Sequence, residues 1–241
     1  MTYTFTNKPA FRKYFLAAII LIISASVSFA QVKKDEALKG DSLAVTNTSM
    51  IDRNFISNPD AETKMTVSNI PGWENITADA QGKGLITTGF YGSVSDDKTN
   101  GAILKSGYGL YYFTSMVGGE NKEASAFQTI DLAPLADSID AGKISYNMSG
   151  AFGGAGDAFA QLSVKFLSGP GSDIGTFYTN NLTADEINTD SLVLVNRVKA
   201  GDVPKGARKM VIQLKFYNLG NSDTPSPAFA DNLSVILLRK P

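Results

Sequence analysis

The chain has 241 residues and a formal net charge of −1, and it contains neither cysteine nor histidine. The missing cysteine excludes disulfides, thiolate nucleophiles and cysteine-bound zinc, and the missing histidine excludes the Ser-His-Asp triad and every His-ligated metal site. Nucleic-acid binding requires a basic stripe, which this balanced charge does not supply, so we expect no nucleic-acid partner.

Residues 1–30 predict a signal peptide. Basic residues precede the apolar run Phe15–Ile23, and the small residues Ser28 and Ala30 stand just before Gln31. A membrane anchor is the competing interpretation, but this run is far shorter than the ~20 residues that span a bilayer. We therefore expect cleavage, no membrane insertion afterwards, and a secreted or periplasmic protein, in an envelope of bacterial type because the chain lacks cysteine.

The mature chain divides into a leader and one domain. Residues 31–50 are polar and charged and show no strand pattern, which predicts a flexible leader. From residue 51 to residue 241 the pattern is that of β-strands throughout, with no βαβ alternation and no repeat. The strands are predicted at Asn54–Ser57, Leu85–Val94, Tyr108–Met116, Ser125–Leu132, Lys143–Ala151, Phe159–Leu167, Ile174–Thr179, Ser191–Val198, Lys209–Tyr217 and Leu233–Leu238.

The alternation within these segments predicts how they pack. In Lys209–Phe216, every second residue is apolar, as it is in Ala160–Phe166, so one side of each strand is buried and the other faces water. Short helical turns are expected at Ala133–Ile139 and at Thr183–Ile187, where Thr183 and Glu186 form a capping box. The predicted fold is all-β: a two-sheet antiparallel β-sandwich of jelly-roll type with one or two short helical turns.

Two segments at opposite ends of the domain carry the strongest signal. An acidic turn, Asn58–Glu62, opens the domain and is followed by Ile70–Trp73, whereas Phe229–Leu237 carries an acidic residue just before the last predicted strand. This arrangement predicts that the first and last strands lie close together. It also suggests that a hard cation holds the two ends, because such cations prefer carboxylate and carbonyl oxygens.

These motifs, together with Ala126–Leu132, resemble the galactose-binding-like jelly rolls, a superfamily that includes many carbohydrate-binding modules. The resemblance implies one structural Ca²⁺ between the opening turn and the last strand. Glu62 and Asp231 would supply carboxylates, and backbone carbonyls near Asn58 and Asp60 would complete the shell. The alternative is that both acids are ordinary turn residues that accept hydrogen bonds from the backbone.

Aromatic residues supply the candidate ligand-binding surface. Trp73, the only tryptophan, is interpreted as a packing residue rather than a sugar-stacking platform. On an extended strand Tyr108 and Tyr112 point to one side and Tyr111 to the other, so one set faces the core and the other can line a groove. The alternative is that aromatic residues simply favour pleated surfaces. The predicted ligand-binding residues are Tyr91, Tyr108, Tyr111 and Tyr112, with Tyr146 and Tyr178 as further candidates.

The sequence therefore predicts a non-catalytic exported module that binds carbohydrate or a cell-surface polymer and contains a structural calcium ion. The alternative is a structural or adhesion protein of the bacterial envelope that contacts protein partners. A third, less favoured alternative is a glycoside hydrolase, which would need two loop carboxylates facing one cleft. The predicted loop acids are Asp60, Glu62, Glu120, Glu123 and Asp157, but the sequence does not select a pair among them. We expect no enzymatic activity.

Overall fold

The computed structural model describes residues 50–63, 70–75, 85–93, 107–118, 122–183, 186, 193–220 and 225–241. The predicted signal peptide and all but the last residue of the predicted leader lie outside this range. In the described ranges, no helix is long and apolar enough to cross a membrane.

Ten strands and three short helical segments make up the described part of the chain. The strands are β1 (Glu74–Asn75), β2 (Thr87–Phe90), β3 (Tyr111–Val117), β4 (Glu123–Asp131), β5 (Ile144–Gly154), β6 (Ala158–Ser168), β7 (Asp173–Tyr178), β8 (Val195–Asp202), β9 (Ala207–Asn218) and β10 (Ser226–Arg239). The helical segments are the 3₁₀ turns η3 (Tyr91–Ser93) and η4 (Ala133–Leu135) and the helix α3 (Ala136–Asp140).

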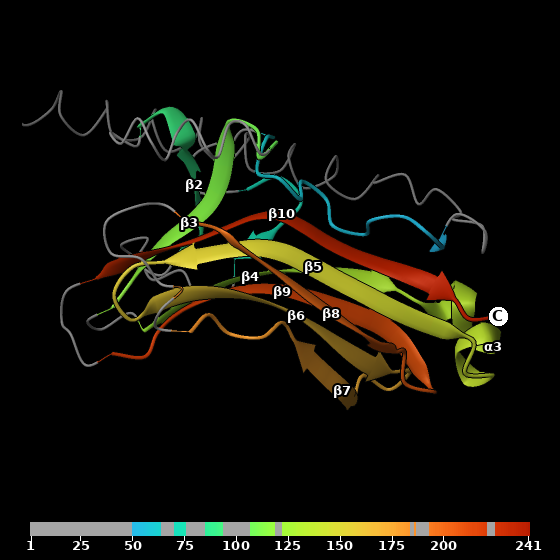
Figure 1. Ribbon diagram of the computed structural model, residues 1–241. Helices are drawn as coiled ribbons and strands as arrows, with labels where there is room; N and C mark the ends of the chain where they lie inside the picture. The colour runs from blue at the N-terminus through green and yellow to red at the C-terminus, as the bar shows by residue number, and fades with distance from the viewer. Residues whose placement is uncertain are drawn as a thin grey trace, which may run out of the picture. The chain divides into compact units, whose positions relative to one another are not determined.

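The strands form two five-stranded sheets, ordered β1-β4-β9-β6-β7 and β2-β3-β10-β5-β8. Every pairing between these strands is antiparallel, and Figure 1 shows β10 between β3 and β5, with β7 at the edge of the other sheet. The predicted two-sheet antiparallel β-sandwich is confirmed. We call the side of each sheet that points away from the other sheet its outer face.

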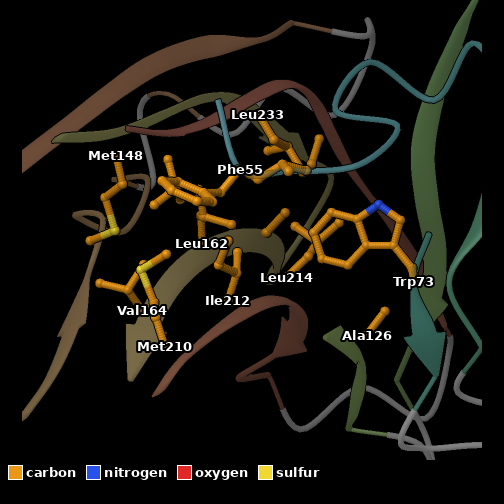
Figure 2. Close-up of a cluster of buried hydrophobic side chains, with 14 of the residues drawn as sticks. Phe55, Trp73, Ala126, Met148, Leu162, Val164, Met210, Ile212, Leu214 and Leu233 are labelled. Carbon is orange, nitrogen blue, oxygen red and sulfur yellow. The ribbon is translucent and has the colours of Figure 1, made fainter. Parts of the chain in front are cut away.

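The core lies between the two sheets and follows from the alternation in sequence. In β9, Met210, Ile212 and Leu214 are completely buried, whereas the residues between them are half-buried. Figure 2 shows Ile212 and Leu214 in one cluster with Met148 of β5 and Leu233 of β10. Burial of such side chains contributes about 1.5–3 kcal/mol each, which explains how the domain is stable without disulfides.

Most predicted elements are present, with several differences. The last strand, β10, begins at Ser226 instead of Leu233, so Asp231 lies within it rather than just before it, and the short edge strand β1 was not predicted. Of the predicted turn at Thr183–Ile187, only Thr183 and Glu186 lie within the described residues.

The predicted helical turn before Ile139 is confirmed as η4 and α3. The first predicted strand is reduced to a single bridge between Asn54 and Ile236, and the chain turns into η3 at Tyr91, where the second was expected to continue. β8 was predicted at Ser191–Val198 but spans Val195–Asp202. Its extent follows the residues that pair with β5, from Phe152 opposite Val195 to Ser145 opposite Asp202.

The opening segment closes against the last strand, as predicted. β3 pairs with the first half of β10, at residues 226–230. The second half is covered by the opening segment, where Phe55 N–H donates to the Val235 carbonyl and Asp52 N–H to the Leu237 carbonyl, both at 2.9 Å. The Gln128 side chain of β4 exchanges two hydrogen bonds with the backbone of Ser57, so the segment is tied to both sheets.

Candidate functional site

Glu62 connects the opening turn to the start of β3. Its Oε1 accepts hydrogen bonds from the backbone N–H groups of Leu110 at 2.6 Å and Tyr111 at 2.8 Å. A Cβ on Gly109 would collide with the same carboxylate, and Gly109 has a φ of 82°. Glycine at this position therefore allows the carboxylate to approach the backbone closely.

Asp231 is a fully buried carboxylate in β10. Its Oδ2 accepts a hydrogen bond from the Tyr91 hydroxyl and its Oδ1 accepts one from the Asn232 N–H, both at 2.7 Å. Burial raises the pKa of Asp231 to about 7. The two hydrogen bonds lower this pKa, whereas the negative charges of Asp60 and Glu62 raise it further. The three acids of the predicted cation site thus lie close enough to influence one another.

A local irregularity holds Asp231 in this position. The pairing of β10 with β5 shifts between Asp231 and Ser234, and Asn232 within the shift has a φ of 48°. Asparagine tolerates this left-handed conformation better than most residues. The next amide, that of Leu233, donates to the Pro59 carbonyl at 2.9 Å, which brings the opening turn against Asp231.

The predicted metal ligands have other partners as well. Asn58 has a φ of 50°, and its carbonyl accepts a 3.3 Å hydrogen bond from Trp73 Nε1. Trp73 is buried and packs edge-on against Phe113, so its predicted packing role is confirmed. Across the described ranges, no three Asp or Glu side chains are grouped so that they could hold a metal ion by themselves. A cation here would need backbone oxygens in addition.

The predicted tyrosine groove is closed, which corrects its assignment as an open binding surface. Tyr91 is completely buried and Tyr112 is 7% exposed, with their ring centroids 4.7 Å apart. Tyr112 also packs edge-on against Phe229 of β10. Stacking on a sugar requires a free ring face, and these two rings offer none because they are packed against each other and their neighbours.

The remaining predicted tyrosines are only partly accessible. Tyr108 is half-buried and packs against the Tyr91 and Tyr112 pair. Tyr111 is half-buried on the opposite side of the strand, where it packs against the core and Phe90.

A crossing segment closes this outer face further. A Cβ on Gly153 of β5 would collide with the carbonyl oxygen of Val193, so the chain just before β8 passes directly over β5. Tyr146, the additional candidate on β5, points into the core instead, where it contacts Phe166 and Phe177.

The outer face of the other sheet carries a different set of aromatic residues and is only partly accessible, because Phe159, Ser125 and Ser163 are buried there. The strand register places side chains in three neighbouring rows: Phe159, Tyr217 and Glu123; Gln161, Lys215 and Ser125; and Tyr178, Ser163, Gln213 and Phe127. We call this set the β9 face. Tyr178 is 48% exposed on the edge strand β7, and Tyr217 stacks on Phe159 with centroids 5.4 Å apart.

Amide groups accompany these rings. Gln161 Nε2 donates to the Thr179 carbonyl at 3.0 Å and to Asn181 Oδ1, and the Tyr217 hydroxyl lies 3.5 Å from Gln161 Oε1. Gln213 is half-buried and lies opposite Phe127 and Ser163 in the strand register. The β9 face therefore combines flat rings with hydrogen-bonding groups.

One ion pair lies in the middle of the β9 face. The Lys215 ammonium is 2.5 Å from a Glu123 carboxylate oxygen and 4.6 Å from the Tyr217 ring centroid. Although burial lowers the pKa of Lys215, its hydrogen bond to Glu123 and the nearby charges outweigh this effect and raise it. Lys215 therefore stays charged at neutral pH.

Sequence reasoning named Tyr178 as a candidate but missed the rest of the β9 face, although the signal is present. The alternation that buries Met210, Ile212 and Leu214 requires Gln213, Lys215 and Tyr217 to face outward. The polar side of this amphipathic strand was interpreted only as facing solvent, so its tyrosine ring and amide groups were not considered as a binding surface.

No protein-family model matches the sequence, and no curated protein matches it. Solved structures show distant likenesses. The enzymatically active domain of tailspike protein 4 from bacteriophage CBA120 is 18% identical, with a TM-score of 0.46 over 77% of this chain, which spans only 21% of that protein. A family 16 carbohydrate-binding module is 15% identical, with a TM-score of 0.43 over 76% of this chain and 99% of its own.

A xylan-binding domain from Paenibacillus barcinonensis is 11% identical, with a TM-score of 0.40 over 76% of this chain and 93% of its own. Several of these structural neighbours are carbohydrate-binding modules, the group of proteins that the opening and closing motifs of this sequence resemble.

Proposed function

We propose that this protein is a non-catalytic, exported carbohydrate-binding module and that it binds glycan on the β9 face. The observation that carries the proposal is the exposed Tyr178 ring in one surface with the Tyr217 ring and the amides of Gln161 and Gln213. Rings stack against the C–H faces of sugars, and amides exchange hydrogen bonds with their hydroxyls.

The shape of the surface supports a polymer rather than a small buried ligand. The three rows extend over four adjacent strands, β4, β9, β6 and β7, which are about 4.8 Å apart. Such a surface spans several sugar units. Rigid strands also hold the side chains in place, so little conformational entropy is lost when a glycan binds.

We also propose a structural Ca²⁺ at the junction of the opening turn and β10. Asp231 is buried near Asp60 and Glu62, and none of the described Lys or Arg side chains forms a salt bridge with these acids. An all-oxygen donor set with concentrated negative charge fits Ca²⁺, with Asp231 and Glu62 as carboxylate ligands and carbonyls at Asn58 and Asp60 as further ligands. The ion would neutralise this charge and join the two ends of the domain.

The glycan proposal is tested by Tyr178→Ala and its matched control Phe90→Ala. Both residues are aromatic and exposed, at 48% and 44%, but Phe90 lies on the other sheet. On a glycan array and by affinity electrophoresis, we expect Tyr178→Ala to weaken binding about three- to tenfold, the value of one aromatic contact. Phe90→Ala should leave binding unchanged.

Absence of glycan binding by the folded wild-type protein would contradict the proposal. Equal losses in the two variants would contradict the assignment to the β9 face. Both variants are expected to retain the wild-type melting temperature, since exposed substitutions usually change stability by less than about 0.5 kcal/mol.

A further inference from the structure

The ion pair on the β9 face is built asymmetrically. The Lys215 side chain is 23% exposed and lies over the Tyr217 ring, whereas the Glu123 side chain is 47% exposed on the neighbouring strand. The Lys215 ammonium therefore packs on the Tyr217 ring, and the Glu123 carboxylate that pairs with it belongs to the more exposed side chain.

Two lysines of the same sheet that lie beyond the three rows of the β9 face are also matched with acids. Lys165 is 3.7 Å from Asp173, and Lys209 lies directly opposite Asp131 in the strand register. Of the three lysines, Lys215 is the one that lies over a ring, that of Tyr217, whereas Lys165 lies one row from Tyr178. The outer face of this sheet therefore carries several cations but little net positive charge.

We propose that Glu123 determines the glycan specificity of the β9 face: by pairing with Lys215 it favours uncharged glycans and excludes acidic ones. This inference rests on the proposed function. Specificity is a difference between affinities, and a repulsive group is an efficient way to create one. A uronate or sulfate group that approached Lys215 would meet the Glu123 charge and would have to displace it.

The pair can still bind an uncharged sugar. The ammonium donates hydrogen bonds and the carboxylate accepts them, so adjacent hydroxyl groups can contact both without either charge being removed. Without Glu123, the same position would present an unpaired cation above an aromatic ring, between the amides of Gln161 and Gln213. That arrangement suits a carboxylate ligand.

The test compares the wild-type protein with Glu123→Gln by affinity electrophoresis in an uncharged polymer, hydroxyethyl cellulose or galactomannan, and in an acidic one, polygalacturonate. A glycan array extends the comparison. We expect the wild type to bind uncharged glycans, and the variant to gain affinity for acidic glycans by up to about fivefold, the upper value of an exposed ion pair. The gain should shrink as salt is added, because exposed charges are screened.

Asp173→Asn is the matched control. It changes the net charge by the same amount and frees Lys165, which lies two rows from Lys215 and is 46% exposed, so its charge is better screened by solvent. We expect no comparable gain. In the double variant Glu123→Gln, Lys215→Met the gain should disappear, which assigns it to the Lys215 ammonium rather than to the loss of Glu123.

The outcomes separate the two proposals. If the folded wild type binds no glycan, the proposed function fails, and this inference fails with it. If the wild type binds uncharged glycans but Glu123→Gln gains no affinity for acidic ones, or if Asp173→Asn gains as much, the inference is wrong and the proposed function stands. A wild type that prefers acidic glycans also overturns the inference.

Discussion

The two outer faces of this sandwich use similar residues for different purposes. On the β3-β10-β5 side, Tyr91 and Tyr112 are packed against each other, and Tyr91 donates its hydroxyl hydrogen bond to a buried carboxylate. On the β9 face, Tyr178 is 48% exposed and Tyr217 is half-buried beside charged and amide groups. The first face buries its tyrosine rings, whereas the second leaves the Tyr178 ring exposed to solvent.

The difference comes from what crosses each sheet. The chain just before β8 passes over Gly153, and the opening turn lies against Asp231, so the first face is covered by the protein's own backbone. The β9 face keeps its outward rows on four neighbouring strands. Aromatic content alone therefore does not identify a binding surface, and the covering segments decide which rings remain available.

The largest expected effect separates the two faces by stability. Tyr91→Ala should lower the free energy of unfolding by about 3–5 kcal/mol, because it removes a fully buried ring and one of the two hydrogen-bond donors of the Asp231 carboxylate. Tyr178→Ala should change it by less than about 0.5 kcal/mol. Chemical denaturation of both variants measures the difference, and equal losses would contradict the division between a structural and an exposed face.

The strands were predictable from sequence because their pattern is local. Alternation in Lys209–Phe216 and Ala160–Phe166 identifies β9 and β6 and assigns their buried sides correctly. The closing of the opening segment on the last strand was also predicted. The strands follow from the pattern of neighbouring residues, and the closing of the opening segment follows from the two motifs at the ends of the domain.

The candidate surface was not predictable in the same way. Tyr112 does point away from the core, as an alternating strand allows, but residues more than twenty and more than eighty positions away, Tyr91 and Leu194, pack against it. Tyr178 and Gln161 come together because β6 and β7 pair, and Tyr217 joins them through β9. Such neighbours depend on register and strand order, which a single sequence does not fix.

The second expected effect is a pH dependence of the free energy of unfolding, and it comes from Asp231 on the β3-β10-β5 side. The pKa of Asp231 is raised from 3.8 to about 7, first by burial. Below pH 3.8 the group is protonated in both states, so there is no penalty. As the pH rises toward 7, the unfolded chain releases this proton while the folded protein retains it, so stability falls and then levels off above pH 7, by up to about 4 kcal/mol.

This fall should be measured between pH 5 and 7.5 in the presence of a chelator. The lower limit matters because Glu186, paired with Arg197, has its pKa lowered to about 2 and therefore adds stability as the pH rises through the acid range. Asp231→Asn removes the titrating group and should flatten the profile. A profile that is identical in the wild type and Asp231→Asn would show that Asp231 does not titrate in this range.

The smallest of these effects concerns the proposed calcium ion, and it distinguishes the faces by function. An ion that binds only the folded protein stabilises it by about 2.7 kcal/mol at a hundredfold excess over Kd. Chelation should therefore lower the melting temperature by about 5–10 °C for a domain of this size. Asp231→Ala should also lower it and make the protein insensitive to chelator.

Glycan affinity should not change on chelation below the melting transition. Asp231 lies in β10 and Glu62 binds the backbone at the start of β3, and both strands belong to one sheet, whereas the β9 face belongs to the other. Calorimetry and affinity electrophoresis on the same samples, with and without EDTA, measure both quantities. A melting temperature unaffected by excess EDTA would leave Asp231 and Glu62 as hydrogen-bonding turn residues. Parallel losses of stability and glycan affinity, measured well below melting, would instead mean that the two faces are coupled through the core.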